Sequence, residues 1–420
     1  MNMSNRLSKR HAAERRLHFF GVLSVVTAVA MLVLLFSNIV IHGHSAFFHS
    51  EVKLHISFDS SVIDPSGARD RQTLKRADYQ SLIRASLMDS FPEVRKRRDI
   101  RKLVKLISRG ASFQLQRMVL KKPSLIGTTA NVWVTSSDTV DMFQKGQFDF
   151  NATESNRGIS SKEVSWIHKL QSDGALRKVF NWRFFSSGDS REPELAGVGG
   201  ALVGSALTML VTLLVAFPLG VMTAIYLQEF APQNHWTDWV EVNINNLAAV
   251  PSIVFGLLGL AVFLSIMELP RSAPIVGGLT LALMTLPTII ITSRVAIGAV
   301  PPSLREAALA IGASPLQTVI HHVLPAAMPG ILTGSIIGMA RAVGETAPLL
   351  MIGMVAFIVD IPTSVDDPST VLPVQIYIWA DSPERGFAEK TSAAIMVLLL
   401  FLVFMNGLAI YLRKRLERRW

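Results

Sequence analysis

The chain contains six apolar stretches that are long enough to cross a membrane. A helix needs about 20 mainly apolar residues to span the hydrocarbon core of a bilayer. One stretch lies near the N-terminus, and the other five follow one another after residue 195. We therefore expect an all-α polytopic membrane protein with six transmembrane helices, over residues 19–41, 199–227, 247–267, 274–297, 330–358 and 391–412.

The first stretch predicts a retained membrane helix with its N-terminal end in the cytoplasm. Its apolar core is longer than that of a secretory signal peptide. Basic residues crowd the preceding residues 1–18, and such residues flank the cytoplasmic ends of membrane helices. Six crossings return the chain to the same side, so we also expect the basic residues 413–420 in the cytoplasm.

Residues 42–195 are then expected outside the membrane, as an inserted α+β domain. Strands are predicted over 52–58 and 131–135, and helical segments over 80–88, 99–108 and 162–185. The segment is rich in Lys and Arg, which does not contradict the orientation, because long domains translocate regardless of charge. Its basic run at 95–98 suits either a solvated helix face, which we favour, or an anion or anionic lipid.

Composition supports the membrane class and excludes several others. Half of the 420 residues are hydrophobic and 17% are charged, against about 25% in soluble domains. The net charge of +10 fits basic cytoplasmic ends, so nucleic acid is not expected as a partner. The chain has no cysteine, no phosphate-binding loop motif, no metal-spaced histidine cluster and no Gly-x-Ser-x-Gly motif. We expect no metal, cofactor or enzymatic activity.

Residues 301–325 predict two short helices that a glycine joins at the cytoplasmic side. Ser303 and Glu306 have the spacing of a capping box, and Gly312 can take the left-handed conformation that ends a helix. Ser314 and Gln317 repeat the capping spacing, and the second helix is expected to stop near Pro325.

The first of these helices would expose apolar side chains to water. The exposed side chains would be those of Ala307, Ala308, Leu309 and Ile311. An apolar patch in water usually marks a binding surface for a partner. Packing on the chain's own membrane helices would cover it equally well, and the pattern does not decide between the two.

Two charged residues interrupt the fifth apolar stretch. Arg341 and Glu345 are four residues apart, so they would share a helix face. Charges in a bilayer are costly and usually face a bundle interior or a polar pathway. A guanidinium suits a phosphate-type oxyanion, so we favour contact with an anion over a structural ion pair.

Two stripes of smaller side chains accompany this pair. Thr285, Thr288 and Thr292 fall on one face of the fourth stretch, where they would line a polar route or bond to their own helix carbonyls. In the fifth stretch small residues recur every four positions, which allows close approach of another helix, in a partner or within the chain. These residues are Gly330, Gly334, Gly338 and Ala342.

The cytoplasmic loop resembles a known family motif. Glu306-Ala307-Ala308, Gly312 and Leu324-Pro325 match the EAA motif of ABC-transporter permeases of the binding-protein-dependent importer type. The resemblance implies a coupling helix that enters a cleft of a cytoplasmic ATP-binding subunit, with Arg305, Glu306, Ala307, Ala308 and Gly312 at the contact. His322 departs from the pattern, which usually has an aliphatic residue there.

Further motifs resemble the permeases of phosphate importers, the PstA and PstC pair. They are residues 249–256 and 340–348, and residues 285–288 with 324–334 favour the PstA type. The resemblance covers 199–413 and leaves the outer domain unexplained.

The resemblance to phosphate-importer permeases implies an inner-membrane permease without catalytic activity of its own. The partners would be a PstC-like permease, two cytoplasmic ATP-binding subunits that hydrolyse ATP, and a periplasmic phosphate-binding protein. Arg341 and Glu345 would lie on the translocation path, and the three threonines are candidates for it. A permease for another oxyanion and a membrane-anchored phosphate sensor or scaffold are the alternatives.

Overall fold

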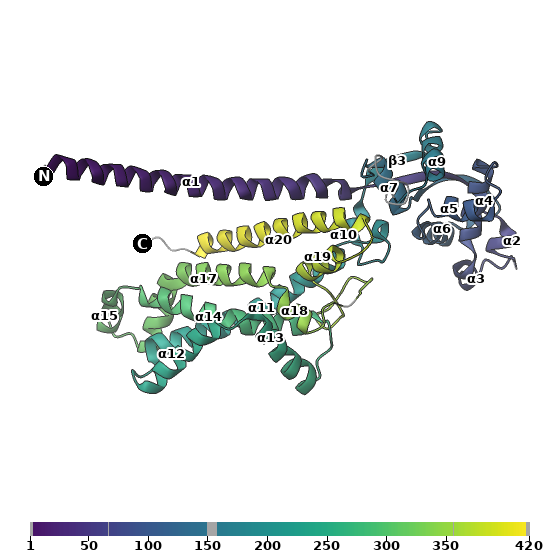
Figure 1. Ribbon diagram of the computed structural model, residues 1–420. Coiled ribbons are helices and arrows are strands. Elements are labelled where there is room, and N and C mark those ends of the chain that lie inside the picture. Colours follow the sequence, from purple (N-terminus) through teal and green to yellow (C-terminus); the bar gives the residue numbers. More distant parts are fainter. Residues whose placement is uncertain (1–2, 66, 149–157, 356, 417–420) are drawn as a thin grey trace.

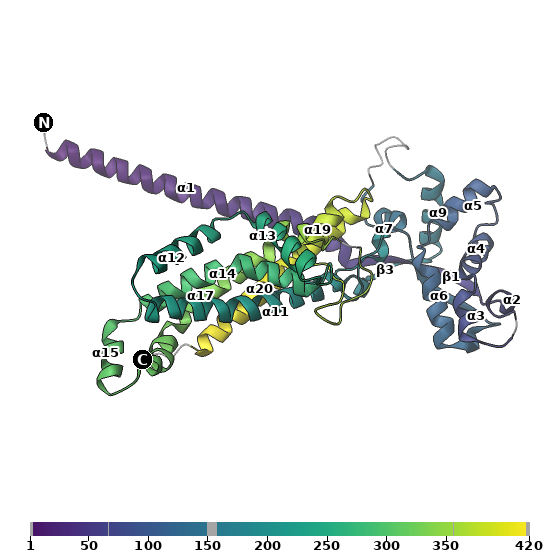
Figure 2. The same cartoon turned by 90° about the horizontal axis from the view of Figure 1, so that it is seen from below.

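The molecule is elongated, with a small sheet at one end and a bundle of long helices at the other (Figures 1 and 2). The computed structural model describes residues 3–65, 67–148, 158–355 and 357–416. The N-terminal end of α1 (Met3–Gly43), the loop helix α15 (Pro302–Ala310) and the C-terminal end of α20 (Gly386–Leu416) all lie at the end opposite the sheet. This arrangement agrees with the expected common side of the two termini and the loop.

The sheet domain is built on a central strand. β1 (Phe48–Ser57) lies between β2 (Thr129–Thr135) and β3 (Leu176–Phe180), and both neighbours are antiparallel to it. Short 3-10 turns flank these elements at His44–Phe47, Pro123–Leu125 and Pro193–Leu195. The helices of this domain and its connector are α2 (Ser60–Ile63), α3 (Arg71–Arg76), α4 (Tyr79–Ser90), α5 (Arg97–Val104), α6 (Gly110–Lys121), α7 (Asp138–Gln144), α9 (Ser161–Ser172) and α10 (Trp182–Ser186).

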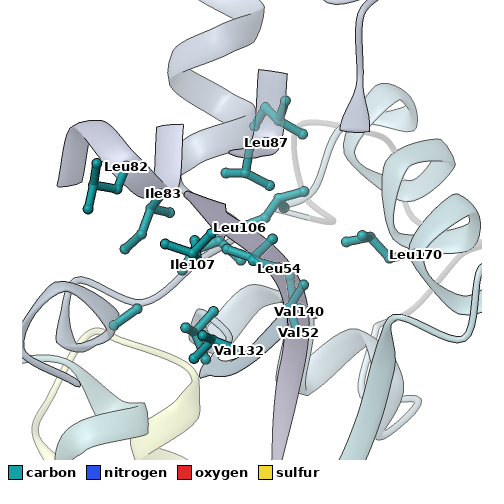
Figure 3. Close-up of a cluster of buried hydrophobic side chains, with 14 of the residues drawn as sticks. Val52, Leu54, Leu82, Ile83, Leu87, Leu106, Ile107, Val132, Val140 and Leu170 are labelled. Atoms are coloured by element: carbon teal, nitrogen blue, oxygen red, sulfur yellow. The ribbon is translucent and has the colours of Figure 1, made fainter. Parts of the chain in front are cut away.

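Alternation along β1 creates the core of this domain. Val52, Leu54 and Ile56 are fully buried, whereas Lys53 and His55 between them are exposed. Side chains alternate between the faces of a strand, so one face of β1 packs against apolar residues of α4, α6 and α9. Figure 3 shows this cluster around the strand. The two predicted strands and the helix over 80–88 are confirmed, with β1 beginning four residues earlier than expected.

The predicted helical stretch over 162–185 is confirmed as far as Ser172 and is wrong beyond it. α9 ends at Ser172, and Gly174 has φ +63°, a left-handed conformation that stops the helix. The chain then forms β3, which pairs with β1, and α10. Tertiary pairing with β1 overrides the local helical pattern here. The helix expected over 99–108 likewise ends early, at Val104.

Long helices form the second part of the molecule. In the described part of the chain, five helical segments are long and apolar enough to cross a membrane, or six if one bent pair counts as a single span. The helices are α1, α11 (Gly199–Ile225), α12 (His235–Ala248), α13 (Ser252–Gly259), α14 (Pro274–Gly298), α15, α16 (Pro315–Thr318), α17 (Leu324–Gly344), α18 (Ala347–Met351), α19 (Leu372–Ala380) and α20, with π-helical turns at Tyr226–Phe230, Leu260–Ile266 and Val319–Val323.

The third apolar stretch does not form the straight crossing that we expected over 247–267. α12 and the following α13 segment meet at a bend of 100°. Pro251 lies at this break, as the N-cap of α13. Proline disfavours a helical conformation at the residue before it. The apolar run is continuous in the sequence, but the helix is broken at this proline.

The fifth apolar stretch is interrupted too, although we expected a crossing over 330–358. α17 begins at Leu324 and ends at Gly344, and Glu345 is already extended, with ψ 123°. The short helix α18 follows with Pro348 in its first turn. Glycine at the helix end and proline soon after it are the usual stop signals, so the charged pair lies where a membrane helix ends.

α14 packs against α11 on one side and α17 on the other through glycine contacts. A Cβ at Gly278 would lie 2.5 Å from Cβ of Val211, and one at Gly334 would lie 2.1 Å from Oγ1 of Thr292. Such spacing permits only glycine. The small-residue stripe of α17 therefore packs within the chain, which settles the alternative that the sequence left open.

A buried polar cluster joins the sheet domain to α20. Nζ of Lys145 lies 2.6 Å from Oε1 of Glu389 and 2.5 Å from Oδ2 of Asp141. Ser45 and Gln147 donate to the other oxygen of Glu389, each at 2.7 Å. Burial alone would lower the pKa of Lys145, but the two carboxylates outweigh it and raise this pKa.

The pKa of a second carboxyl group beside this cluster, that of Asp138, is strongly raised. Burial raises the pKa of Asp138 to about 7, and the nearby carboxylates of Glu194, Asp141 and Glu389 add to the shift. Lys390 donates to the carbonyl of Ala196 at 2.8 Å. The domain thus contacts the start of the last membrane helix through charged groups that water does not reach.

Candidate functional site

The loop 301–325 forms the two short helices that the sequence predicts. Gly312 has φ +92°, so the left-handed turn between α15 and α16 requires glycine. At α16, N–H of Gln317 donates to Oγ of Ser314, and N–H of Ser314 donates to Oε1 of Gln317 at 2.9 Å. This capping box confirms the predicted start of the second helix.

Two local predictions for this loop are wrong. Pro301, not Ser303, is the N-cap of α15, because Pro302 already occupies the first helical position. The second helix does not stop near Pro325 either. It continues through the π-helical turn Val319–Val323 into α17. Pro325 lacks a backbone N–H, and it directly follows the π-helical turn, where the regular hydrogen-bond pattern of the helix is already interrupted.

Arg305 ties the loop to the ends of two membrane helices. Its guanidinium donates to Glu229 at 2.7 Å, beyond the end of α11, and to the carbonyls of Ile297 and Val300 at 2.9 and 2.7 Å. The last carbonyls of a helix have no partner within that helix and attract cations. Arg305 therefore fixes α15 to both α11 and α14.

The remaining loop residues separate into a buried and an exposed set. Ala308 is buried against the chain, whereas Glu306 and Ala307 are exposed. Leu309, Ile311 and Leu316 are also exposed, and Ile311 is 80% accessible. We call these three residues the apolar tip. It projects at the end of the molecule opposite the sheet, where Figure 1 shows α15.

The charged pair lies at the other end of α17. Nε of Arg341 is 3.5 Å from Oε1 of Glu345, and the Arg341 side chain is 54% accessible. Glu345 follows the helix rather than lying on it, so the pair bridges the helix end. The long contact leaves most of the guanidinium donors of Arg341 available to another group.

The threonine stripe turns toward α17. Thr285 is buried and donates to the carbonyls of Leu281 and Ala282, and Thr292 donates to the carbonyl of Thr288 at 2.8 Å. Hydroxyls that bond back to their own helix are satisfied without a ligand. Among the described residues, no hydrogen bond joins these three threonines to Arg341 or Glu345.

Sequence reasoning missed two ion pairs. One is Glu229 with Arg305. The other is Arg294 with Glu241, at 2.5 Å, which joins α14 to α12. Arg294 lies inside an apolar stretch that reads as nearly uncharged. A charge in such a stretch needs a partner, so the sequence already indicated that Arg294 would be paired. The partner in α12 follows only from the fold.

Two family models match the chain. Residues 188–418, more than half of the chain, match "Binding-protein-dependent transport system inner membrane component". Residues 4–154 match a domain of unknown function, DUF3333. The gap between the two matches contains α9 and β3 of the sheet domain as well as α10.

Several curated relatives are similar to part of the chain. The probable ABC transporter permease protein YqgI of Bacillus subtilis is 35% identical over 40% of this chain and 58% of its own length, less than two thirds. The phosphate transport system permease protein PstA 1 of Mycobacterium tuberculosis is 31% identical over 60% of this chain and 83% of its own. A solved structure of the MetNI methionine ABC transporter covers 53% of this chain and 96% of its own, at 19% identity and a TM-score of 0.41.

The chain belongs to the family of binding-protein-dependent transport system inner membrane components. It is a PstA-like permease of this family, with an additional N-terminal region that matches a separate family model. The family description implies a multi-pass protein of the inner membrane that works with a binding protein.

Proposed function

We propose that the chain is the PstA-like permease subunit of an ATP-driven phosphate importer. The partners would be a PstC-like permease, two ATP-binding subunits that carry out the hydrolysis, and a periplasmic phosphate-binding protein. The observation that carries the proposal is the loop 301–325, because its apolar tip is exposed while Arg305 fixes it to two membrane helices.

The loop geometry supports a role in transmitting force. An ATP-binding subunit that covers the apolar tip removes apolar surface from water, which favours docking. Movement of that subunit would shift α15. Because Arg305 contacts Glu229 and the end of α14, the shift would reach α11 and α14 together.

The charged pair supports an anionic substrate. Arg341 is exposed on a membrane helix, where an uncompensated charge is unfavourable unless a polar pathway or partner faces it. We propose that it faces the path between the two permeases and contacts phosphate in transit, with Glu345 holding the guanidinium when the path is empty. Thr285, Thr288 and Thr292 then contribute through packing of α14 on α17.

A permease for another oxyanion uses the same guanidinium chemistry. Competition of sulfate, arsenate and phosphonate against phosphate uptake distinguishes these substrates. A sensor or scaffold would not need an apolar tip locked to membrane helices, and it would show no ATP-dependent uptake.

Labelling of single cysteines tests the proposed orientation, because the chain has no cysteine of its own. A membrane-impermeant maleimide should label Lys122→Cys in the outer domain of intact cells after permeabilisation of the outer membrane alone. Ile311→Cys in the apolar tip should react only after the inner membrane is opened. The opposite labelling pattern would reverse the topology.

Arg305→Met tests coupling. The apolar tip is unchanged, so the ATP-binding subunit should still assemble, but its movement should no longer reach α11 and α14. Loss of a charge-assisted contact of about 1.5–3 kcal/mol should lower uptake per assembled complex about tenfold or more. Arg413→Met is the matched control, because Arg413 at the same end of the bundle contacts only Thr333 among the described partners, at 3.0 Å. Equal uptake in both variants would contradict this coupling role.

A further inference from the structure

A cavity lies where the outer domain meets the membrane bundle. Its volume is about 570 Å³. α6 of the outer domain contributes one wall, and α10 with the connector that follows it contributes another. The loop 359–361 closes the third side. Among the lining residues are Gly110, Phe113, Arg117, Arg183, Ser186 and Ser190.

The connector wall is held in place by backbone contacts. N–H of Asp189 donates to the carbonyl of Ile358 at 2.9 Å. Gly188 approaches the carbonyl oxygen of Val359 so closely that a Cβ would lie 2.2 Å from it. The cavity is therefore a built feature of the junction and not a gap between independently placed parts.

Two arginines face this cavity without a carboxylate on either guanidinium. In the described part of the chain, neither Arg117 nor Arg183 forms an ion pair or a side-chain hydrogen bond. Arg183 is half-buried, and burial together with the neighbouring charge of Arg117 lowers its pKa. Like charges held together in a partly desolvated site are unfavourable unless an anion lies between them.

The acidic residues nearby are engaged elsewhere or point to solvent. Oδ1 of Asp189 accepts from Nε1 of Trp379 at 2.9 Å and from N–H of Ser190. Glu51 pairs with Arg177, and Asp360 at the cavity edge is exposed. Glu194 is buried beside Ser108. Glu51 and Glu194 offset part of the charge of Arg183, and Asp189 and Asp360 also line the cavity. In the described part of the chain none of these carboxylates forms an ion pair with Arg117 or Arg183, so both guanidiniums keep their donors for an anion.

We propose that this cavity binds a phosphate-type oxyanion between Arg117 and Arg183. The forked donors of two guanidiniums match the tetrahedral oxygens of such an anion. The anion is either inorganic phosphate or the headgroup of an anionic phospholipid, because the site adjoins the membrane bundle. The first source rests on the proposed function, since it would concentrate substrate at the outer entrance.

Binding to the full chain in lipid nanodiscs tests the site. In phosphatidylcholine discs at low ionic strength, radiolabelled inorganic phosphate should bind the wild-type chain. Arg183→Gln and Arg117→Gln should weaken this binding about tenfold or more. Arg101→Gln, at an exposed position of α5, is the charge-matched control and should bind as wild type. Arg117→Gln keeps the test valid if Arg183→Gln fails to fold, because Arg117 is exposed.

A second arm identifies the lipid source. In discs that contain phosphatidylglycerol, native mass spectrometry should detect a bound lipid that Arg117→Gln and Arg183→Gln lose. Arginine-dependent binding in either arm supports the site and tells the two sources apart. If neither inorganic phosphate nor lipid binding differs between these variants and Arg101→Gln, the proposal is wrong. Failure of ATP-dependent uptake alone would reject the importer function but not this site.

Discussion

Uptake of phosphate per assembled complex should fall about tenfold or more when Arg341 is replaced by lysine, because the lost charge-assisted contacts contribute about 1.5–3 kcal/mol. The substitution keeps the positive charge but removes the planar fork of donors. Arg341 is exposed at the end of α17, and its contact with Glu345 is long. The side chain therefore has the room and the donors to bind an anion.

Glu345→Gln and a double variant separate transport from a structural lock. If Arg341 contacts the anion, Glu345→Gln should change uptake, and Arg341→Gln with Glu345→Gln should remain inactive although the complex assembles. If the pair only holds helices together, the double variant should restore both assembly and uptake. Arg294→Gln with Glu241→Gln is the matched control, because this pair joins α14 to α12 and has no proposed contact with the anion. Full uptake per complex in the Arg341–Glu345 double variant would exclude the transport role.

Lys145→Met should detach the outer domain from α20. The variant leaves Glu389 and Asp141 as two buried carboxylates without their shared cation. Breaking a buried ion pair costs about 3–5 kcal/mol, which corresponds to a drop of roughly 6–20 °C in the Tm of a domain of this size. Thermal unfolding of the purified chain and proteolysis at the junction measure the effect.

Lys169→Met provides the matched control for this prediction. Lys169 pairs with Glu93 at 3.1 Å on the surface of the same domain, and exposed pairs contribute about 0–1 kcal/mol. Glu389→Gln should fall between the two variants, because Lys145 keeps Asp141 and the amide keeps hydrogen bonds to its neighbours. Equal melting temperatures for Lys145→Met and Lys169→Met would show that the cluster does not hold the domain.

The same cluster changes the expected result of removing the outer domain. The sequence describes residues 42–195 as an inserted domain, and replacing most of it, residues 51–190, by a short linker would then be expected to leave the membrane core folded. In the structure, Lys145 and Gln147 of that domain donate hydrogen bonds to Glu389. Deletion would leave an unpaired charge at the start of α20, so a truncated core needs Glu389→Gln as well.

The sequence by itself determined the class of protein, most of the helices and the two-helix form of the loop 301–325. The lengths of the apolar stretches are sufficient to identify the membrane helices, because the bilayer core requires about 20 apolar residues in a helix. Gly312 and the Ser314 capping box were readable for the same reason, since each depends on residues only a few positions apart. The motif around Glu306 identified the family without any knowledge of packing.

Only the tertiary structure decided which residues meet across the fold. Arg305 directly precedes the motif residues Glu306-Ala307-Ala308, but its partner Glu229 lies 76 positions away. β3 was read as helix because its pairing with β1 is not encoded locally. The stop of α17 before Glu345 and the junction of Lys145 with Glu389, 244 positions apart, depend in the same way on neighbours that local patterns do not specify. Sequence patterns report the local periodicity of a segment, whereas ion pairs, strand pairing and cavities arise where distant segments are brought together by packing.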